Sequence, residues 1–321
     1  MSEVDQLVRN VLAGDSKALA KAISMVELYH ADAEIFLSKL HRHLSGRPVI
    51  GFSGPPGSGK STLIGRVVEH LTGKGLKVGV LAIDPSSPFT GGAVLGDRVR
   101  MTAVSSKPGV FIRSMATKGV RGGVAVNARA VLRVFDAAGF DVILVETAGA
   151  GQTDVSVNDV ADVVAIVVTP DMGDSIQAIK AGLLEVGDVY VVNKADDVRS
   201  SLTATMLETM LSRRDAKPTV LKTVATRGEG VGELVETLLK TWERLNMSGE
   251  ISARRKRQAV AEVVAMMLER MRSAAEKLAS NRQFAAEVEK LVADGLEPRV
   301  IAWLKLPLLL NECLTKPMHT S

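Results

Sequence analysis

The residues from 54 to 61 read Gly-Pro-Pro-Gly-Ser-Gly-Lys-Ser, which is the complete pattern of a phosphate-binding loop. An apolar run at 49–52 precedes this loop, and a run with helical spacing at 62–71 follows it. Glycines let successive backbone N–H groups approach phosphate oxygens, and the start of a helix adds partial positive charge. The order of strand, loop and helix therefore predicts an α/β fold with a nucleotide at the start of the helix.

The side chains of the loop have distinct expected roles. Lys60 would reach the β- and γ-phosphates, and the Ser61 hydroxyl would bind Mg²⁺. The residues expected to contact the phosphates are Gly57, Ser58, Gly59, Lys60, Ser61 and Thr62. The alternative is a glycine-rich turn that binds no ligand, and the strand and helix on either side disfavour it.

A second motif, Asn193-Lys194-Ala195-Asp196, follows the apolar strand expected at 189–192. The Asp196 carboxylate can accept hydrogen bonds from the N1–H and the exocyclic amine of guanine, whereas adenine would present a lone pair at N1. Such a tetrapeptide alone often caps a helix, but here it ends a strand downstream of a phosphate loop. The two motifs together predict GTP and GDP as ligands.

A third segment, Thr223-Val224-Ala225, follows the strand expected at 219–221 and precedes Gly228. It fits a loop that closes over the base with a backbone N–H. An ordinary turn is the alternative for this segment.

Composition narrows the class of protein and its partners. Of 321 residues, 46% are hydrophobic and 24% charged, which is ordinary for a soluble globular protein. Aromatic residues make up 3%, so we expect no nucleic-acid partner despite a net charge of +4. The single cysteine, Cys313, favours a reducing compartment. The acidic N-terminus lacks the pattern of a signal sequence and the apolar runs are short, so we expect a cytoplasmic protein without a membrane partner.

Three regions follow one another along the chain. Residues 1–45 have helical spacing of apolar residues and predict an N-terminal helical layer. Between 46 and 246, apolar runs alternate with helical ones and predict a P-loop GTPase domain, with a mostly parallel central sheet wrapped by helices. The expected strands are 49–53, 78–83, 110–113, 142–146, 163–169, 189–192 and 219–221. Residues 247–321 predict a C-terminal helical extension.

The extension carries an apolar stripe at helical spacing from Val260 to Met271. Such a stripe is more often core than a cofactor site. A homodimer interface is a second use, which would make the extension a dimerisation arm. The basic cluster at 254–257 predicts a solvated helix start or a surface for a partner.

Carboxylates follow two of the expected strands, where they would lie near the phosphates. Asp84 ends the strand at 78–83 and Glu146 ends the strand at 142–146, and both offer hard oxygen ligands for Mg²⁺. Asp97 lies in a glycine-rich stretch and would reach the metal when that loop closes. Arg100, or alternatively Arg98, would then neutralise charge on the transferred phosphoryl group. The alternatives are a helix cap for Asp84 and a salt-bridged surface loop for Asp97 and the arginines.

Four segments taken together resemble one protein family, the methylmalonyl-CoA mutase-associated GTPases. They are residues 83–87, 90–92, 96–101 and 146–152, and the last, Glu-Thr-Ala-Gly-Ala-Gly-Gln, is the most specific. The resemblance implies a homodimeric GTPase of the signal-recognition-particle and metal-chaperone class. It implies as partner an adenosylcobalamin-dependent acyl-CoA mutase, whose cofactor loading the GTPase gates and which it protects from inactivation.

The resemblance also assigns roles to residues of this chain. Lys60, Ser61, Asp84, Asp97 and Glu146 become the phosphate and Mg²⁺ set, and Asn193, Lys194 and Asp196 become the base site. Residues 173–180 match a mobile element that senses the mutase, although Ser175 stands where the family has an acidic residue. Slow hydrolysis without the partner is expected, because the mobile segments lack an obvious residue that would position the attacking water, and the nearby Gln152 is more simply explained as structural.

Other functions remain open. A nickel-delivery GTPase for hydrogenase or urease maturation would carry Cys and His ligands near the nucleotide, and this chain has none there. A nucleotide-dependent kinase of a transport system would need an ATP site, which Asp196 disfavours. A nucleotide-dependent scaffold without hydrolysis is the third alternative.

Overall fold

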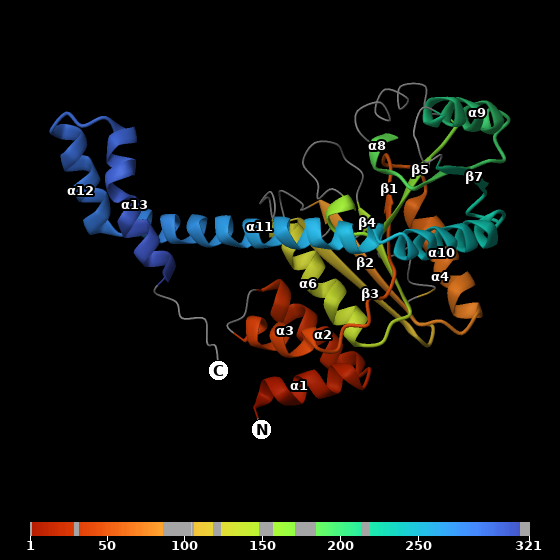
Figure 1. The fold of residues 1–321 in the computed structure, drawn as a ribbon, viewed down its shortest axis with the longest axis horizontal. Helices are drawn as coiled ribbons and strands as arrows, with labels where there is room; N and C mark the ends of the chain where they lie inside the picture. The colour runs from red at the N-terminus through yellow and green to blue at the C-terminus, as the bar shows by residue number, and fades with distance from the viewer. Residues whose placement is uncertain are drawn as a thin grey trace. The chain divides into compact units, whose positions relative to one another are not determined.

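A sheet of parallel strands forms the centre of the fold (Figure 1). The computed structural model describes residues 2–28, 32–85, 104, 106–117, 123–147, 157–170, 184–212 and 218–314. Within them the sheet has seven strands in the order β3-β2-β4-β1-β5-β6-β7. The strands are β1 (Val49–Ser53), β2 (Val78–Pro85), β3 (Val110–Thr117), β4 (Val142–Thr147), β5 (Val163–Val168), β6 (Val189–Asn193) and β7 (Thr219–Thr223). The predicted α/β fold with a parallel sheet is confirmed.

The central strands form because their residues are apolar on both faces. Every residue of β1, β4, β5 and β6 is buried, which explains why their sequences are continuous runs rather than alternating ones. The strand β3 is longer than expected and pairs with β2 along its whole length. Polar residues such as Arg113 interrupt its apolar pattern because β3 lies at an edge of the sheet, where one side of the strand is half-buried.

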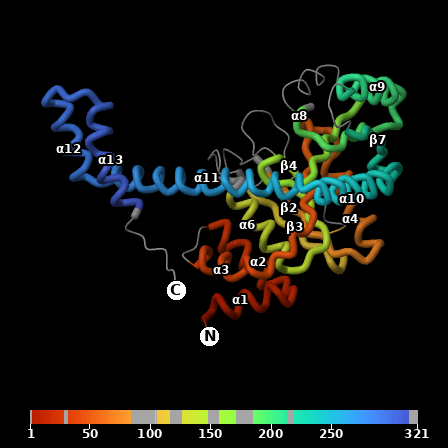
Figure 2. Tube along the Cα trace, viewed as in Figure 1, coloured from red at the N-terminus to blue at the C-terminus, as the bar shows by residue number. Residues whose placement is uncertain are grey.

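Helices cover both faces of the sheet. They are α1 (Glu3–Leu12), α2 (Ser16–Glu27), α3 (Ala33–His41), α4 (Lys60–Gly73), α6 (Gly123–Ala137), α8 (Leu184–Val186), α9 (Ser200–Leu211) and α10 (Val231–Met247), with a 3-10 turn η1 (Val157–Asp159). The helices α4 and α10 share one hydrophobic core with the sheet. The helices α6 and α9 share a second core, in which α1, α2 and α3 pack outside α6 (Figure 2). The two cores take alternate residues of the strands, such as Leu144 and Val145.

The first turns of a long helix, α11 (Glu250–Ser280), are bound to the amino ends of the strands. Asp162 directly precedes β5 and is 2% exposed. Its carboxylate accepts hydrogen bonds from Nε (2.8 Å) and Nη2 (2.6 Å) of Arg255, from the backbone N–H of Val49 (3.0 Å) and from Trp242 Nε1 (3.2 Å). The hydrogen bonds to Asp162 raise the pKa of Arg255 above its usual value. The contact therefore joins α11 to two strands and to α10.

A second arginine of α11 makes the same kind of contact one strand further along the sheet. Arg254 donates from Nη1 (2.7 Å) and Nη2 (2.8 Å) to Asp188, which precedes β6 and also accepts the backbone N–H of Val164 (2.9 Å). The expectation of a solvated basic cluster at 254–257 is thus wrong for Arg254 and Arg255. The acidic residues that precede two buried strands are their partners, and such long-range pairs cannot be seen in the local sequence.

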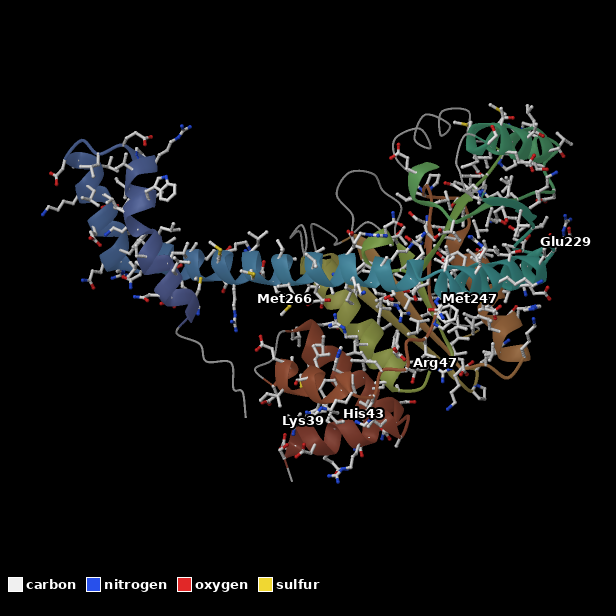
Figure 3. The ribbon with its side chains drawn as sticks, viewed as in Figure 1. Lys39, His43, Arg47, Glu229, Met247 and Met266 are labelled. Atoms are coloured by element: carbon white, nitrogen blue, oxygen red, sulfur yellow. The ribbon has the colours of Figure 1, made fainter. Side chains whose placement is uncertain are left out.

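The chain divides into two compact units, Met1–Gln258 and Ala259–Ser321. The second unit holds the rest of α11 with α12 (Arg282–Ala293) and α13 (Pro298–Leu314). Asn281 caps α12 by accepting the N–H groups of Gln283 and Phe284. Large apolar residues of this unit are exposed, including Val263 (57%), Met267 (61%) and Trp303 (76%). The apolar stripe of α11 is therefore exposed and not part of a core within this chain. Figure 3 shows the side chains along α11, where Met266 is labelled.

The ion pair between Arg255 and Asp162 should contribute to the stability of the fold. We expect Arg255→Ala to lower the free energy of unfolding by about 2–3 kcal/mol, because a buried carboxylate loses its counter-charge but keeps two other donors. The partial exposure of the guanidinium places the loss below the largest values for such pairs. Arg257→Ala is the control, since that side chain is exposed and should cost less than about 0.5 kcal/mol. Urea denaturation measures both, and equal losses would contradict the assignment.

Candidate nucleotide-binding site

The phosphate-binding loop connects the end of β1 at Ser53 to the start of α4 at Lys60. Gly54 has φ 142°, and a Cβ there would lie 2.0 Å from the carbonyl oxygen of Val167 in β5. Gly59 has φ 87°, and a Cβ there would lie 2.4 Å from Nδ2 of Asn193. Both positions therefore require glycine for space and for backbone conformation. The loop is tightly packed against the carboxyl ends of the neighbouring strands.

Lys60 lies at the first position of α4 and is buried. Its Nζ donates to the carbonyl oxygens of Gly54 (2.7 Å) and Pro55 (3.1 Å). The ammonium group is thus held inside the curve of the loop, next to the amino end of the helix. Positive charge from both sources suits this curve to an anion.

The side chains of Ser61 in α4 and Glu146 in β4 are hydrogen-bonded to each other. Ser61 Oγ in the first turn of α4 donates to Glu146 Oε1 at the end of β4 over 2.6 Å, and both side chains are buried. The meeting follows from the sheet, because β4 pairs with β1 and places Glu146 opposite Phe52, near the end of β1. A hydroxyl and a carboxylate are hard oxygen donors of the kind that Mg²⁺ prefers, so this pair fits the ion chemically. Among the described residues no cluster of three or more His, Cys, Asp or Glu forms a metal site.

The other residues expected around the phosphates are only partly described. The backbone of Asp84 lies in β2, which pairs with β4 so that Ile83 is opposite Thr147. The carboxyl ends that carry Asp84 and Glu146 are therefore adjacent. Asp97, Arg98 and Arg100 lie outside the described residues, as do Gln152, Ser175 and Lys180.

Asn193 ends β6 and is buried between two loops. Its Nδ2 donates to the carbonyl oxygen of Ser58 (2.9 Å) in the phosphate-binding loop. Its Oδ1 accepts from Thr223 Oγ1 (3.1 Å) and from the N–H of Ala225 (3.1 Å). The sequence places Asn193 at the base but does not reveal this link between the phosphate-binding loop and the loop after β7.

The two residues after Asn193 turn the chain and set the position of Asp196. Lys194 has φ 57°, which is unusual for a residue other than glycine. The N–H of Ala195 donates to the carbonyl oxygen of Thr223 (3.0 Å), so the turn is tied to the loop after β7. The side chain of Asp196 is 50% exposed, and Nη2 of Arg227 lies 4.0 Å from its carboxylate. Its carboxylate is accessible to a base.

The neighbouring Asp197 has a different role. It accepts from Nε (2.9 Å), Nη2 (2.6 Å) and the backbone N–H (2.8 Å) of Arg199, just before α9. The hydrogen bonds from Arg199 lower the pKa of Asp197 to about 2. Asp197 is therefore engaged within its own turn, and Asp196 is the carboxylate available to a guanine.

The loop after β7 has a defined shape. Val224 donates its N–H to the carbonyl oxygen of Glu229 (3.0 Å), and Glu229 is labelled in Figure 3. Gly230 has φ 73°, and a Cβ there would lie 2.2 Å from the carbonyl oxygen of Lys222. The loop thus closes on itself while Ala225 and Thr223 contact Asn193. This geometry fits a loop at the edge of a base-binding site.

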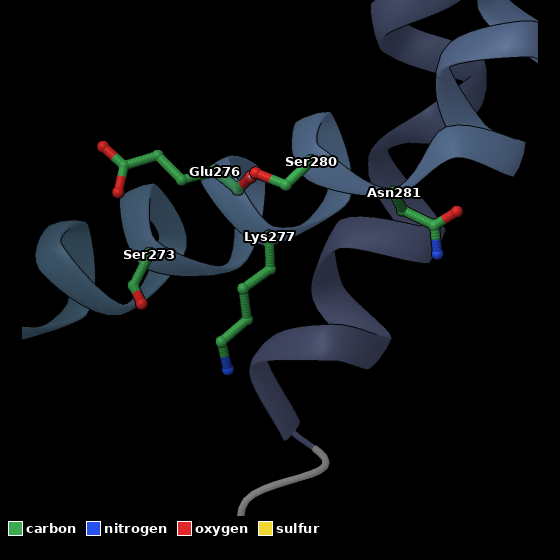
Figure 4. Close-up of a pocket in the computed structure, with 5 residues that line it drawn as sticks. All are labelled: Ser273, Glu276, Lys277, Ser280 and Asn281. Carbon is green, nitrogen blue, oxygen red and sulfur yellow. The ribbon is translucent and has the colours of Figure 1, made fainter.

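The structure also has a pocket that none of these residues lines. It has a volume of about 360 Å³ in the second unit, and Figure 4 shows its polar lining. The lining residues are Ser273, Glu276, Lys277, Ser280 and Asn281. None of the residues predicted to bind nucleotide is among them.

Comparisons with known proteins agree with this geometry. The model of the family described as methylmalonyl Co-A mutase-associated GTPase MeaB matches residues 19–280. A Pyrococcus horikoshii protein, provisionally named a GTPase, is 42% identical over 270 residues, which are 82% of this chain and 85% of that protein. The mitochondrial methylmalonic aciduria type A homolog of Mus musculus is 34% identical over 279 residues, covering 79% of this chain and 67% of its own.

A solved structure supports the same assignment of fold. The crystal structure of LAO/AO transport system kinase superimposes with a TM-score of 0.71 at 27% identity, and the match covers 97% of this chain and 98% of that one. The resemblance inferred from the sequence motifs is confirmed. The chain belongs to the methylmalonyl-CoA mutase-associated GTPase family.

Proposed function

We propose that this chain is a GTP-hydrolysing chaperone of an adenosylcobalamin-dependent acyl-CoA mutase, whose cofactor loading it gates and which it protects. The observation that carries the nucleotide part is the buried Asn193 amide, which bonds to the phosphate-binding loop and to the loop after β7. This link fixes the distance between a site for phosphates and a site for a base. Family membership supports the mutase as partner.

The residues around Lys60 would bind the phosphates. Its ammonium now donates to two loop carbonyls, and it would exchange them for the β- and γ-phosphate oxygens. Backbone N–H groups of residues 57–62 would surround the same oxygens. Ser61 and Glu146, with Asp84 at the adjacent strand end, would hold Mg²⁺, which supplies neutralising charge at the phosphates.

The groups proposed for hydrolysis lie beyond the described residues. Asp97 would join the metal site when its segment closes, and Arg100 would offset charge on the transferred phosphoryl group. Residues 148–156 follow β4 directly after Glu146 and Thr147, and residues 171–183 follow the segment after β5. Because both segments follow strands at the carboxyl ends of the sheet, a partner that contacts them would act on the nucleotide.

A homodimer built on the C-terminal extension, residues 247–321, is part of the proposal. Exposed apolar residues recur along α11, and singly exposed ones would need no explanation whereas a continuous stripe does. The exposed members of the stripe are Val260, Val263, Val264, Met267 and Leu268. A second copy of the chain would cover these residues symmetrically.

No helix within the described parts of the chain combines the length and apolar character needed to cross a membrane.

The kinase alternative is disfavoured by the base motif, because the accessible carboxylate of Asp196 would face the N1 lone pair of adenine.

Nucleotide choice tests the base site. We expect GDP and GTP to bind at micromolar concentrations and ADP and ATP to bind at least a hundredfold more weakly, because only guanine offers two donors to Asp196. Asp196→Asn should shift preference toward xanthine nucleotides, whose additional carbonyl pairs with the amide. Asp197→Asn is the matched control and should keep the preference for guanine, since Asp197 is engaged with Arg199. Calorimetric titration measures these affinities, and equal binding of ADP and GDP would contradict the site.

Partner coupling tests the proposed chaperone role. We expect GTP turnover by the purified chain to be slow and to rise at least tenfold with a cobalamin-dependent acyl-CoA mutase, about 1.4 kcal/mol of added transition-state stabilisation. Lys180→Ala should reduce the stimulated rate more than the basal rate. Asp97→Ala should reduce both rates without weakening the binding of GDP. Lys60→Ala serves as the inactive reference. Phosphate release is measured with increasing mutase, and a flat response with the complex formed would reject the coupling.

The oligomeric state tests the dimerisation arm. We expect sedimentation equilibrium to give twice the chain mass of 34.1 kDa at micromolar concentration. The double variant Val263→Glu with Met267→Glu should be monomeric, because charges cannot be buried in the apolar interface. Val198→Glu is the control, since Val198 is an apolar residue of the first unit that is 94% exposed. A wild-type chain that sediments as a monomer would contradict the proposal.

A further inference from the structure

A guanidinium on α4 holds the loop that follows β7. Arg66 donates from Nε to the carbonyl oxygen of Ala225 (3.1 Å) and from Nη2 to the carbonyl oxygen of Thr226 (2.8 Å). Its Nη1 donates to Glu69 Oε2 (2.8 Å) on the next turn of the same helix. All three contacts involve charged groups, which make hydrogen bonds about twice as strong as neutral pairs. The same helix that begins with Lys60 thus also determines where this loop lies.

Ala225 is held from two sides. Its carbonyl oxygen accepts from Arg66, and its N–H donates to Asn193 Oδ1 (3.1 Å). The residue is 3% exposed, so water has little access to either group. With both of its peptide groups bonded, the residue has a fixed orientation. The planar fork of an arginine is suited to this task, because two of its N–H groups reach adjacent carbonyls in a set geometry.

The fixed segment lies beside the base motif. The carbonyl of Thr223 accepts the N–H of Ala195, which precedes Asp196. A trans peptide directs its N–H opposite to its carbonyl. The bond from Arg66 to the carbonyl oxygen of Ala225 therefore turns the Thr226 N–H away from the guanidinium. Because the N–H of Ala225 already donates to Asn193 Oδ1, the N–H of Thr226 is the backbone donor of this segment that would meet the carbonyl oxygen at C6 of guanine.

We propose that Arg66 is a positioning residue for guanine recognition, which acts by holding the carbonyls of Ala225 and Thr226 so that a backbone N–H of this loop meets the guanine O6. The inference rests on the proposed GTP-binding function. Arg66 would read the 6-oxo group through the loop, while Asp196 reads N1–H and the 2-amino group directly. Two different elements would then supply the specificity for guanine.

Three nucleotides separate this role from a general contribution to the fold. GDP carries O6, N1–H and the 2-amino group; inosine diphosphate keeps O6 and N1–H and lacks the amine; 2-aminopurine riboside diphosphate lacks O6 and has a lone pair at N1, so it binds the wild type more weakly than GDP. We expect Arg66→Ala to weaken the binding of GDP and of inosine diphosphate by the same factor, about tenfold. The affinity for the 2-aminopurine nucleotide should stay unchanged. Arg66→Lys should give a smaller loss with the same pattern, because one ammonium replaces the fork. Competition titrations on the full chain measure all three affinities.

The same titrations are done on a control variant, and their results can contradict the inference. Arg244→Ala removes an exposed arginine from α10, the helix that packs on α4, and should change none of the affinities. Equal weakening of all three nucleotides by the Arg66 variants would overturn the inference, and so would unchanged GDP affinity. Wild-type protein that does not bind GDP would instead overturn the proposed function on which the inference rests.

Discussion

The buried amide of Asn193 is the contact on which the arrangement of the site depends. It donates to the Ser58 carbonyl and accepts from Thr223 and Ala225, so that one side chain joins loops from three strands. Each of these groups is buried, and an unpaired buried polar group costs about 1–3 kcal/mol. The spacing between the phosphate-binding loop and the base motif is therefore set by hydrogen bonds that are already made.

The two ends of the sheet have different roles. At the carboxyl ends lie Lys60, the pair of Ser61 with Glu146, and the base motif, as expected for ligands of parallel α/β sheets. At the amino ends, Asp162 and Asp188 bind the arginines that begin α11. The start of α11 is thus bound at the amino ends of the strands. The residues predicted to bind nucleotide lie at the opposite ends of the strands.

Much of the fold could be predicted from the sequence because the signals are local. Continuous Val and Ile runs located the buried strands, and the glycine pattern located the phosphate-binding loop. The edge strand β3 was predicted too short because its polar residues, such as Arg113, break the apolar run. The bridge from Asn193 to Ser58 joins residues 135 positions apart, and that from Arg66 to Ala225 joins residues 159 apart. Local patterns carry no information about such pairs, which explains why the sequence assigned Asn193 only to the base and did not mark Arg66.

A crystal structure of the chain with GDP and Mg²⁺ would show directly whether one nucleotide joins the two loops that Asn193 links. We expect a single nucleotide that spans the site, with guanine against Asp196 and phosphates inside the loop at 54–61. Lys60 Nζ should have left the carbonyl oxygens of Gly54 and Pro55 for phosphate oxygens, while Asn193 keeps its bonds to both loops. A nucleotide bound with its base away from Asp196, or with Lys60 still bonded to the loop carbonyls, would contradict the account.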